Sequence, residues 1–326
     1  MSTYLLPLLL LTLRAAISPV DAFSASSLRQ GTANDLLQSL VADEQCFSTQ
    51  SGAQTFADAC ATNAVYEDCY EPQPFTGRIN IKNHLFDKVD QRKGKGFVRI
   101  DRMSDGTQAC GFAWTWVTSD QTEEGLRGTT FVELNDRGEI QFIREIPEPI
   151  FKPGDLTLEL LRAVTKDAEP RQLPPYQHRV PVNANDMVKY LFNELQGRDV
   201  GEAMQLFSND IIYRDFNYDD VLRGKDEVQQ FIEDFSFPGI EFRAQRFDDG
   251  VVSTCFTWEV VLMDAPDTVK GISFYELEPD TGLIKYVRDV PESAIKPPIL
   301  GKIARQLRPG LGVFQGVKAG SRPGGM

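Results

Sequence analysis

The sequence predicts an α+β protein built from two tandem copies of one domain. One observation is a repeated motif: "VYEDCYEPQPFTG" (Val65–Gly77) returns as "IYRDFNYDDVLRG" (Ile212–Gly224), each with a Tyr, an Asp two residues on and a Gly nine residues after that Asp. Further segments match in the same order, among them "FAW" and "FTW", "GTTFVEL" and "GISFYEL", and "IREIPEPIFKP" and "VRDVPESAIKP". Matches at several places in one order indicate a duplicated domain.

Both copies carry the same order of expected elements. A helix with apolar periodicity begins after Asn34 or Asn185, whose side-chain oxygen can cap it. A short helix, clearest at Val200–Ser208, then a short strand and a third helix opened by the motif Gly come next. Four strands with period-two alternation follow, in the first copy "GFVRIDRM", "QACGFAWTWV", "RGTTFVEL" and "EIQFIREI". Helices followed by an antiparallel sheet give α+β, and a curved sheet over helices gives a cone with an interior cavity.

Composition narrows the classes of function. The 326 residues are 41% hydrophobic and 25% charged, which is ordinary for a globular protein with two domains. The net charge of −13 disfavours a general nucleic-acid binder. The five cysteines have neither a disulfide-scaffold spacing nor a C-x-x-C pair, and the chain has two histidines. No metal site and no cofactor are therefore expected.

The N-terminus is predicted to be a sorting signal. "YLLPLLLLTL" is an apolar run of signal-peptide length, too short to span a bilayer, and Val20 and Ala22 occupy the small-residue positions before a cut. Residues 1–22 are thus predicted to be a signal peptide. Residues 23–32 begin with Phe23, contain Ser and Arg but no acid, and resemble the transit segments of algae with complex plastids. We expect a plastid protein, with secretion as the alternative.

The predicted organisation places a Pro-rich linker between the copies and a basic, Gly-rich tail at the end. The boundaries are 33–165 for the first domain, 166–183 for the linker, 184–307 for the second domain and 308–326 for the tail. After Glu292 the chain has no acid and six basic residues. Residues 299–307 have an amphipathic pattern, so this segment either packs on the sheet as a helix or contacts an anionic membrane surface peripherally.

The pattern "VYED…PFTGR", "GTTFVEL" and P-E-x-x-x-K-P resembles the nuclear-transport-factor-2-like superfamily, which includes SnoaL-like polyketide cyclases and ketosteroid isomerases. It is most similar to a SnoaL-like family of plant and algal plastids. The resemblance covers Ala33–Val164 and Ala184–Leu307. It implies cone-shaped, cystatin-like domains of a kind that often form homodimers, a pairing that a duplicated chain can itself replace. It implies no settled activity.

The resemblance also nominates a catalytic base. In ketosteroid isomerases an Asp at the end of the short strand moves a proton, and this position falls on Asp68 and Asp215. That chemistry needs a carboxylate whose pKa is raised by an apolar pocket. The alternative is a structural carboxylate that accepts a backbone hydrogen bond at the strand end.

The oxyanion donors of those isomerases are incomplete in this chain. The Tyr position falls on Leu40 and Leu191, and the protonated Asp position falls on Thr130 and Ser273. One donor is lost and the other is reduced to a hydroxyl. Losing one such donor typically lowers the rate ~10²–10³-fold, which argues against ketosteroid-type isomerisation.

Four aromatic residues complete the candidate pocket. Tyr66 and Tyr213 share a strand face with the Asp two residues on, and are either pocket hydroxyls or core residues. Trp114 and Trp258 either belong to the core or line a pocket for a flat apolar ligand, together with Thr130 and Ser273.

Three further residues are assigned roles outside this pocket. Arg144 and Arg288 are each followed by an acid and are predicted to tie the last strand to the next loop through ion pairs. Gripping a carboxylate ligand is the alternative. His84 is predicted to be a surface or packing residue.

Three functions remain open on these grounds. The first is a non-catalytic plastid protein that binds an apolar small molecule or a protein partner. The second is an isomerase, cyclase or dehydratase on an apolar lipid, polyketide or carotenoid-like substrate, with Asp68 or Asp215 as base. The third is a structural assembly factor that uses its sheet faces and basic tail.

Overall fold

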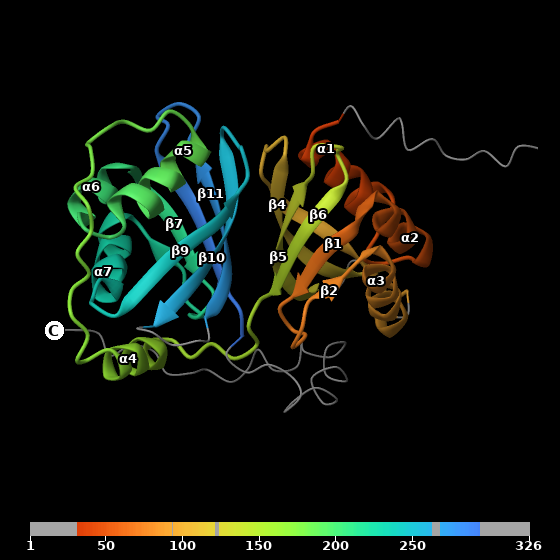
Figure 1. Ribbon diagram of the computed structural model, residues 1–326, viewed down its shortest axis with the longest axis horizontal. Helices are drawn as coiled ribbons and strands as arrows, with labels where there is room; N and C mark the ends of the chain where they lie inside the picture. The colour runs from red at the N-terminus through yellow and green to blue at the C-terminus, as the bar shows by residue number, and fades with distance from the viewer. Residues whose placement is uncertain (1–30, 93, 121–123, 263–267, 294–326) are drawn as a thin grey trace, which may run out of the picture.

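The computed structural model describes residues 31–92, 94–120, 124–262 and 268–293 (Figure 1). The predicted signal peptide, most of the predicted transit segment and the chain from residue 294 onward lie outside these residues. Within the described ranges, no helix is both long enough and apolar enough to cross a bilayer.

Two domains carry the same elements in the same order, which confirms an α+β protein with two sheet domains. The first contains α1 (Ala33–Gln38), η2 (Ser39–Asp43), α2 (Gln50–Ala59), β1 (Cys60–Asp68), β2 (Phe75–Thr76), α3 (Arg78–Arg92), β3 (Gly96–Met103), β4 (Ala109–Thr118), β5 (Glu124–Leu134) and β6 (Ile140–Pro147). After α4 (Asp155–Val164), the second contains α5 (Ala184–Lys189), η3 (Tyr190–Leu195), α6 (Val200–Gln205), β7 (Phe207–Asp215), β8 (Leu222–Arg223), α7 (Lys225–Phe235), β9 (Ile240–Phe247), β10 (Ser253–Leu262), β11 (Val269–Leu277) and β12 (Ile284–Pro291).

Each domain has one six-stranded sheet, ordered β2-β1-β6-β5-β4-β3 in the first and β8-β7-β12-β11-β10-β9 in the second. The sheets are mixed rather than wholly antiparallel as expected, because β1 pairs with β6, and β7 with β12, in parallel. This pairing puts the end of the short strand beside the end of the last strand. Asp68 is thereby opposite Glu145, and Asp215 opposite Asp289.

The first helix of each domain begins one residue before the predicted cap, so the observed cap lies two residues before it. Thr32 caps α1 and forms a capping box with Asp35, and the Asn183 side chain accepts from Asp186 N to cap α5. The predicted caps, Asn34 and Asn185, lie inside the helices instead. Their amide groups donate to the carbonyl oxygens of Ser104 and Asp248, so they tie each helix to its sheet.

The motif glycines have the backbone conformation that the turn requires. Gly77 and Gly224 have φ angles of 87° and 84°, a left-handed region that glycine adopts without strain. α3 and α7 begin at the next residue, which confirms the prediction that this Gly opens the third helix.

The two sheets face each other at the centre of the molecule, and the helices lie on the outer sides (Figure 1). An apolar cluster from both sheets fills the space between them, including Phe131, Phe142, Ile272 and Phe274. The chain therefore folds as a pair of domains joined through their sheet faces.

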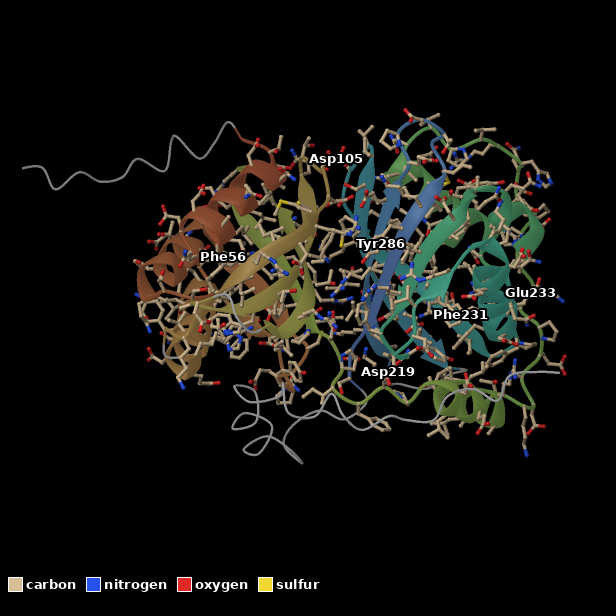
Figure 2. The ribbon with its side chains drawn as sticks, turned by 180° about the vertical axis from the view of Figure 1, so that it is seen from behind. Phe56, Asp105, Asp219, Phe231, Glu233 and Tyr286 are labelled. Atoms are coloured by element: carbon tan, nitrogen blue, oxygen red, sulfur yellow. The ribbon has the colours of Figure 1, made fainter. Side chains whose placement is uncertain are left out.

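The contacts across this interface are reciprocal. Asp105 of the first domain accepts from the backbone N–H groups of Val251 and Ser253, and Asp249 of the second accepts from those of Thr107 and Gln108. Figure 2 shows Asp105 at the boundary between the domains. An approximate twofold relation therefore exchanges the two copies.

Arg144 and Arg288 are the buried cations of this interface. Arg144 Nη1 donates to the carbonyl oxygens of Trp258 and Gly271, at 3.2 and 3.4 Å. Arg288 Nη2 donates to the carbonyl oxygen of Gly128, at 3.2 Å, and to Glu148. The prediction that each arginine ties its own last strand to the next loop was wrong, because both cross to the other domain.

One close contact makes the interface asymmetric. The equivalent positions Gly111 and Cys255 meet across it, and a Cβ atom built at Gly111 would lie 2.1 Å from Cys255 Sγ and 2.2 Å from Cys255 Cβ. Glycine is thus required opposite this cysteine. Two copies of either domain alone would place Cys opposite Cys or Gly opposite Gly.

We expect Gly111→Ala to destabilise the protein by about 1–3 kcal/mol, because the added methyl group overpacks the interface. The exchange variant Gly111→Cys with Cys255→Gly should recover most of that loss, since the pair is then reversed. Urea unfolding of the wild type, the single variant and the exchange variant measures both effects. An exchange variant no more stable than Gly111→Ala contradicts this account.

The segment after β6 also crosses to the second domain. Residues 149–168, called the α4 arm below, contain α4, which lies beside the second domain in Figure 1. The backbone N–H of Gly154 donates to Asn217 O at 2.9 Å, and Arg162 Nη2 donates to Asp234 O at 2.9 Å. The Pro-rich linker then runs along the second domain, held by Arg171 to Glu241.

Candidate functional site

The first domain holds a buried ionic network at the predicted base. Lys88 Nζ, on α3, donates to Asp68 at 3.0 Å and to Glu145 at 2.6 Å. His84 Nε2, one turn earlier, lies 3.1 Å from Asp68 Oδ2, and its ring stacks on Phe75 with centroids 3.9 Å apart. All four charged or ionisable side chains are buried. His84 is therefore a buried partner of Asp68 as well as a packing residue.

This network holds Asp68 in its ionised form. Burial by itself would raise the pKa of Asp68, but the Lys88 ammonium and the hydrogen bond from His84 hold it well below its ordinary value. The Tyr70 backbone N–H also donates to Asp68, at 3.0 Å, as a structural carboxylate at a strand end would accept. Such a carboxylate is a weaker base than a free aspartate.

The second domain has an equivalent carboxylate pair, Asp215 and Asp289, without counterparts of Lys88 and His84. Phe231 and Phe235 on α7 occupy the positions of His84 and Lys88, counted from the motif glycines. Their rings lie 4.9 Å apart, and Phe231 also packs on Tyr213 at 5.5 Å. Figure 2 shows Phe231 on the sheet side of α7, with Glu233 on the outer side.

Without those cations, the second pair stays protonated to higher pH. Burial and the adjacent Asp289 raise the pKa of Asp215 to about 7, and burial raises that of Asp289 to about 6. The Asn217 backbone N–H donates to Asp215 at 2.7 Å, and Tyr213 and Ser273 donate to Asp289. Because the hydroxyl donors converge on Asp289, the half-buried Asp215 is the carboxyl group better placed to exchange a proton near pH 7.

The other predicted residues form matched pairs in the two domains. Trp114 Nε1 donates to Thr130 Oγ1 at 3.0 Å, and Trp258 Nε1 donates to Ser273 Oγ at 2.7 Å. Tyr66 donates to Glu145 as Tyr213 does to Asp289. Of the eight predicted residues, all except Asp215 are buried, and the structure brings them into two equivalent clusters of four.

Sequence reasoning missed Lys88 as the residue that distinguishes the two clusters. The signal was present, because aligning α3 with α7 from the motif glycines puts Lys opposite Phe235 and His opposite Phe231. This difference did not lead to a prediction, because a lysine in a helix is usually solvent-exposed. Only tertiary packing turns Lys88 towards the sheet.

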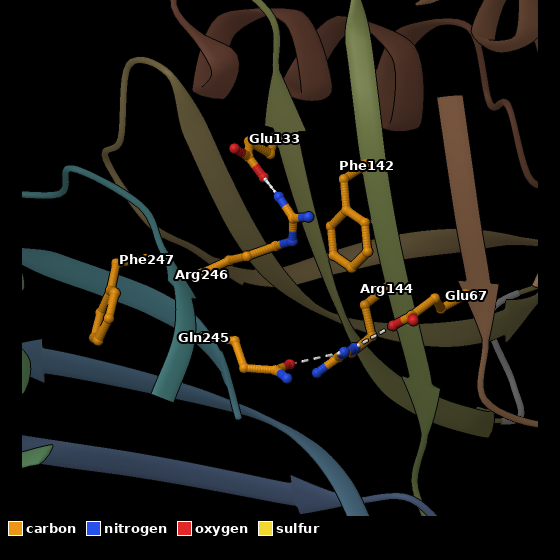
Figure 3. Close-up of a pocket in the computed structure, with 7 residues that line it drawn as sticks. All are labelled: Glu67, Glu133, Phe142, Arg144, Gln245, Arg246 and Phe247. Atoms are coloured by element: carbon orange, nitrogen blue, oxygen red, sulfur yellow. Dashed lines mark hydrogen bonds and ion pairs between the residues drawn. The ribbon is translucent and has the colours of Figure 1, made fainter. Parts of the chain in front are cut away.

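Two cavities lie elsewhere. A cavity of about 540 Å³ opens between the domains, lined by Glu67, Glu133, Phe142, Arg144, Gln245, Arg246 and Phe247 (Figure 3). Its two arginines are already paired, Arg144 with Glu67 at 2.6 Å and Arg246 with Glu133. The second, of about 260 Å³, lies between η3 and β9. Among the described residues, no group of His, Cys, Asp and Glu is arranged to hold a metal ion.

Comparison with known proteins found one family model that matches the second domain. A family model described as "SnoaL-like domain" matches residues 188–287, which include Tyr213, Asp215, Trp258 and Ser273. None of the curated proteins compared with this chain matches it.

Solved structures of similar fold each align with about a third of this chain. One is a candidate ketosteroid isomerase from Kribbella flavida, 23% identical, covering 35% of this chain and 81% of its own, with a TM-score of 0.30. Another is a candidate isomerase of the SnoaL-like family from Agrobacterium tumefaciens, 17% identical, covering 35% and 97%, with a TM-score of 0.30. A third is an NTF2-like protein of unknown function from Mesorhizobium loti, 11% identical, covering 37% and 100%, with a TM-score of 0.31. Residues 188–287 thus match the SnoaL-like domain model, and the first domain repeats the order of strands of the second.

Proposed function

We propose that the second domain performs proton transfer on an apolar small molecule, with Asp215 as the general base, and that the first domain is its non-catalytic structural partner. The observation that carries this proposal is the difference between two equivalent carboxylate pairs. One is bonded to Lys88 and His84, and beside the other Phe231 and Phe235 take the places of those two residues.

The pKa of Asp215 suits this role. A base works best when its pKa is near the operating pH, and burial and Asp289 raise that of Asp215 to about 7. Phenylalanines at the α7 positions where α3 has His84 and Lys88 also favour a substrate with little polarity near the reacting carbon. Isomerisation, cyclisation and dehydration of a lipid, polyketide or carotenoid-like molecule all begin with such a proton transfer. From the pattern of residues 1–32, we propose the plastid as its place of action.

Ligand binding without catalysis is the second candidate. The specific observation in its favour is that Ser273 and Tyr213 are both engaged by Asp289, so neither hydroxyl is directed at a developing oxyanion. A bound ligand that is never converted fits this arrangement.

Asp215→Asn separates the two candidates. The full chain is incubated with an apolar extract of plastid-bearing cells, and substrate loss and product formation are followed by mass spectrometry. We expect Asp215→Asn to lower turnover by at least ~10²-fold, the lower range for losing a general base. Asp289→Glu, which keeps a carboxylate beside Asp215, should retain part of the activity.

Native mass spectrometry of the same samples supplies the second readout. Product formation that is equal in the wild type and in Asp215→Asn refutes the proposed base. A bound mass that is unchanged by incubation in both proteins instead supports ligand binding without catalysis.

A further inference from the structure

We propose that the chain beyond Ser293 crosses to the first domain and packs against the Cys69–Pro74 loop and α3, as the α4 arm packs on the second domain. The two domains would then exchange arms. This inference concerns an interaction surface on the first domain and is independent of the proposed proton transfer.

The α4 arm shows what such a crossing looks like. Besides its backbone bond to Asn217, its Lys152 Nζ lies 3.6 Å from Asp219 Oδ1 and 5.3 Å from the centroid of the Phe216 ring. A Cβ atom built at Gly239 would lie 2.7 Å from the Thr165 side chain, so the end of the arm is in close contact with the second domain too. The arm thus covers the loop after Asp215 and the end of α7.

The chain leaves both sheets in the same way. The Glu148 N–H, after β6, donates to Arg127 O at 2.8 Å, and the Glu292 N–H, after β12, donates to Lys270 O at 2.8 Å. Lys270 is itself 2.7 Å from Glu67 of the first domain. The approximate twofold relation therefore directs the chain after Glu292 towards the first domain, just as it directs the α4 arm towards the second.

The sequence repeats the first part of the arm. "PEPIFKP" ends at Pro153, and "PESAIKP" ends at Pro297, which puts Lys296 at the position of Lys152. The motif alignment puts Tyr70 at the position of Asn217, and the exposed Asp87 at that of Asp234. Asn217 and Asp234 are the two residues of the second domain whose backbone oxygens accept hydrogen bonds from the α4 arm.

Apolar packing is expected to dominate this contact. Ile79, in the first turn of α3, is 74% exposed although it is a large hydrophobic residue. The segment from 299 to 307 carries Ile299, Leu300 and Ile303. α3 has basic residues of its own, so attraction between charges would contribute little and added salt should leave the contact in place. Binding of the same segment to an anionic membrane would weaken with salt.

Amide hydrogen exchange on three forms of the protein tests the inference. These are the full chain, a chain ending at Ser293, and a control chain ending at Pro309 that lacks only the Gly-rich end. We expect exchange in residues 69–76 and 79–87 to rise about tenfold in the chain ending at Ser293, and not in the control. Exchange in β5 and β11 reports whether the truncated protein keeps its fold, and Ile79→Asp in the full chain should reproduce the effect without truncation.

Three results overturn the inference. One is unchanged exchange on the first domain in both altered proteins. Another is a rise confined to the outer face of α4, where Leu156 and Leu160 are 62% and 64% exposed. The third is protection of α3 that appears only when vesicles containing phosphatidylserine are present and disappears at 0.5 M salt, added to screen surface charges. None of these results bears on Asp215, so this proposal and the proposed function can fail separately.

Discussion

At pH 7, Asp68→Asn is expected to destabilise the protein by about 3 kcal/mol, whereas the same change at the equivalent position, Asp215→Asn, is expected to stabilise it. Asp68 is one member of a buried ion pair, and removing one partner typically costs 3–5 kcal/mol. We expect a cost at the lower end of this range, because Lys88 still has Glu145 as an ion-pair partner, with Nζ and Oε1 2.6 Å apart. Within the described part of the chain no ion pair holds Asp215, and burial and Asp289 disfavour its ionised form more than Lys152 of the α4 arm favours it.

The two effects depend on pH in different ways. The pKa of Asp68 is lowered in the folded protein, so its contribution to stability is present above its ordinary pKa of 3.8 and is lost as the pH falls towards the folded value. The pKa of Asp215 is raised to about 7, so the folded protein loses stability between about pH 4 and pH 7, because over that range this group ionises in the unfolded chain but stays protonated in the folded one. The gain from Asp215→Asn should therefore grow over that range.

Urea unfolding at pH 5 and pH 8 measures both variants under the same conditions. Asn is nearly isosteric with Asp, which keeps packing constant and makes each variant the control for the other. Destabilisation of equal size by both variants at pH 8 is incompatible with the assigned environments.

The second large effect is expected at the domain interface. Arg288→Met should cost about 3–5 kcal/mol, because a buried guanidinium that satisfies Glu148, Thr129 and a backbone oxygen is removed. Arg288 is 6% exposed, so water cannot replace these bonds readily. The measurement is the free energy of unfolding in urea.

Arg102→Met is the matched control. Arg102 also crosses the interface, pairing with Glu276, but its side chain is 40% exposed. Exposed ion pairs contribute about 0–1 kcal/mol, so this variant should be nearly as stable as the wild type. Similar losses in the two variants would show that burial does not govern the energetics of the interface.

The duplicated fold was predictable because it follows from short-range patterns in the sequence. Strand alternation, the motif glycines and the repeated segments each fix part of the chain without knowledge of the rest. Parallel pairing of β1 with β6 was not predictable in this way, since it depends on which strands meet after the helices have packed. The caps were displaced to Thr32 and Asn183 because a second residue able to cap a helix stands two positions before each predicted cap.

The contrast between the two carboxylate pairs required the structure. The motif located Asp68 and Asp215, but their chemistry is set by residues on α3 and α7 whose contact with the carboxylates depends on tertiary packing. The arginines illustrate the same limit. Arg144 and Arg288 were assigned to local ion pairs because their neighbours in sequence are acidic, while the carbonyl oxygens that they bind across the interface are more than a hundred residues away.

Because both domains are on one polypeptide, a mutation changes only one of the two domains. In an assembly of two identical chains, every substitution appears on both sides of the interface, and a cysteine could not face a glycine at equivalent positions as Cys255 faces Gly111. The tandem chain is free of that constraint. One domain can keep a lysine beside its carboxylates while the other has phenylalanine at that position. A substitution that specialises one domain therefore does not have to be compatible with the packing of the other.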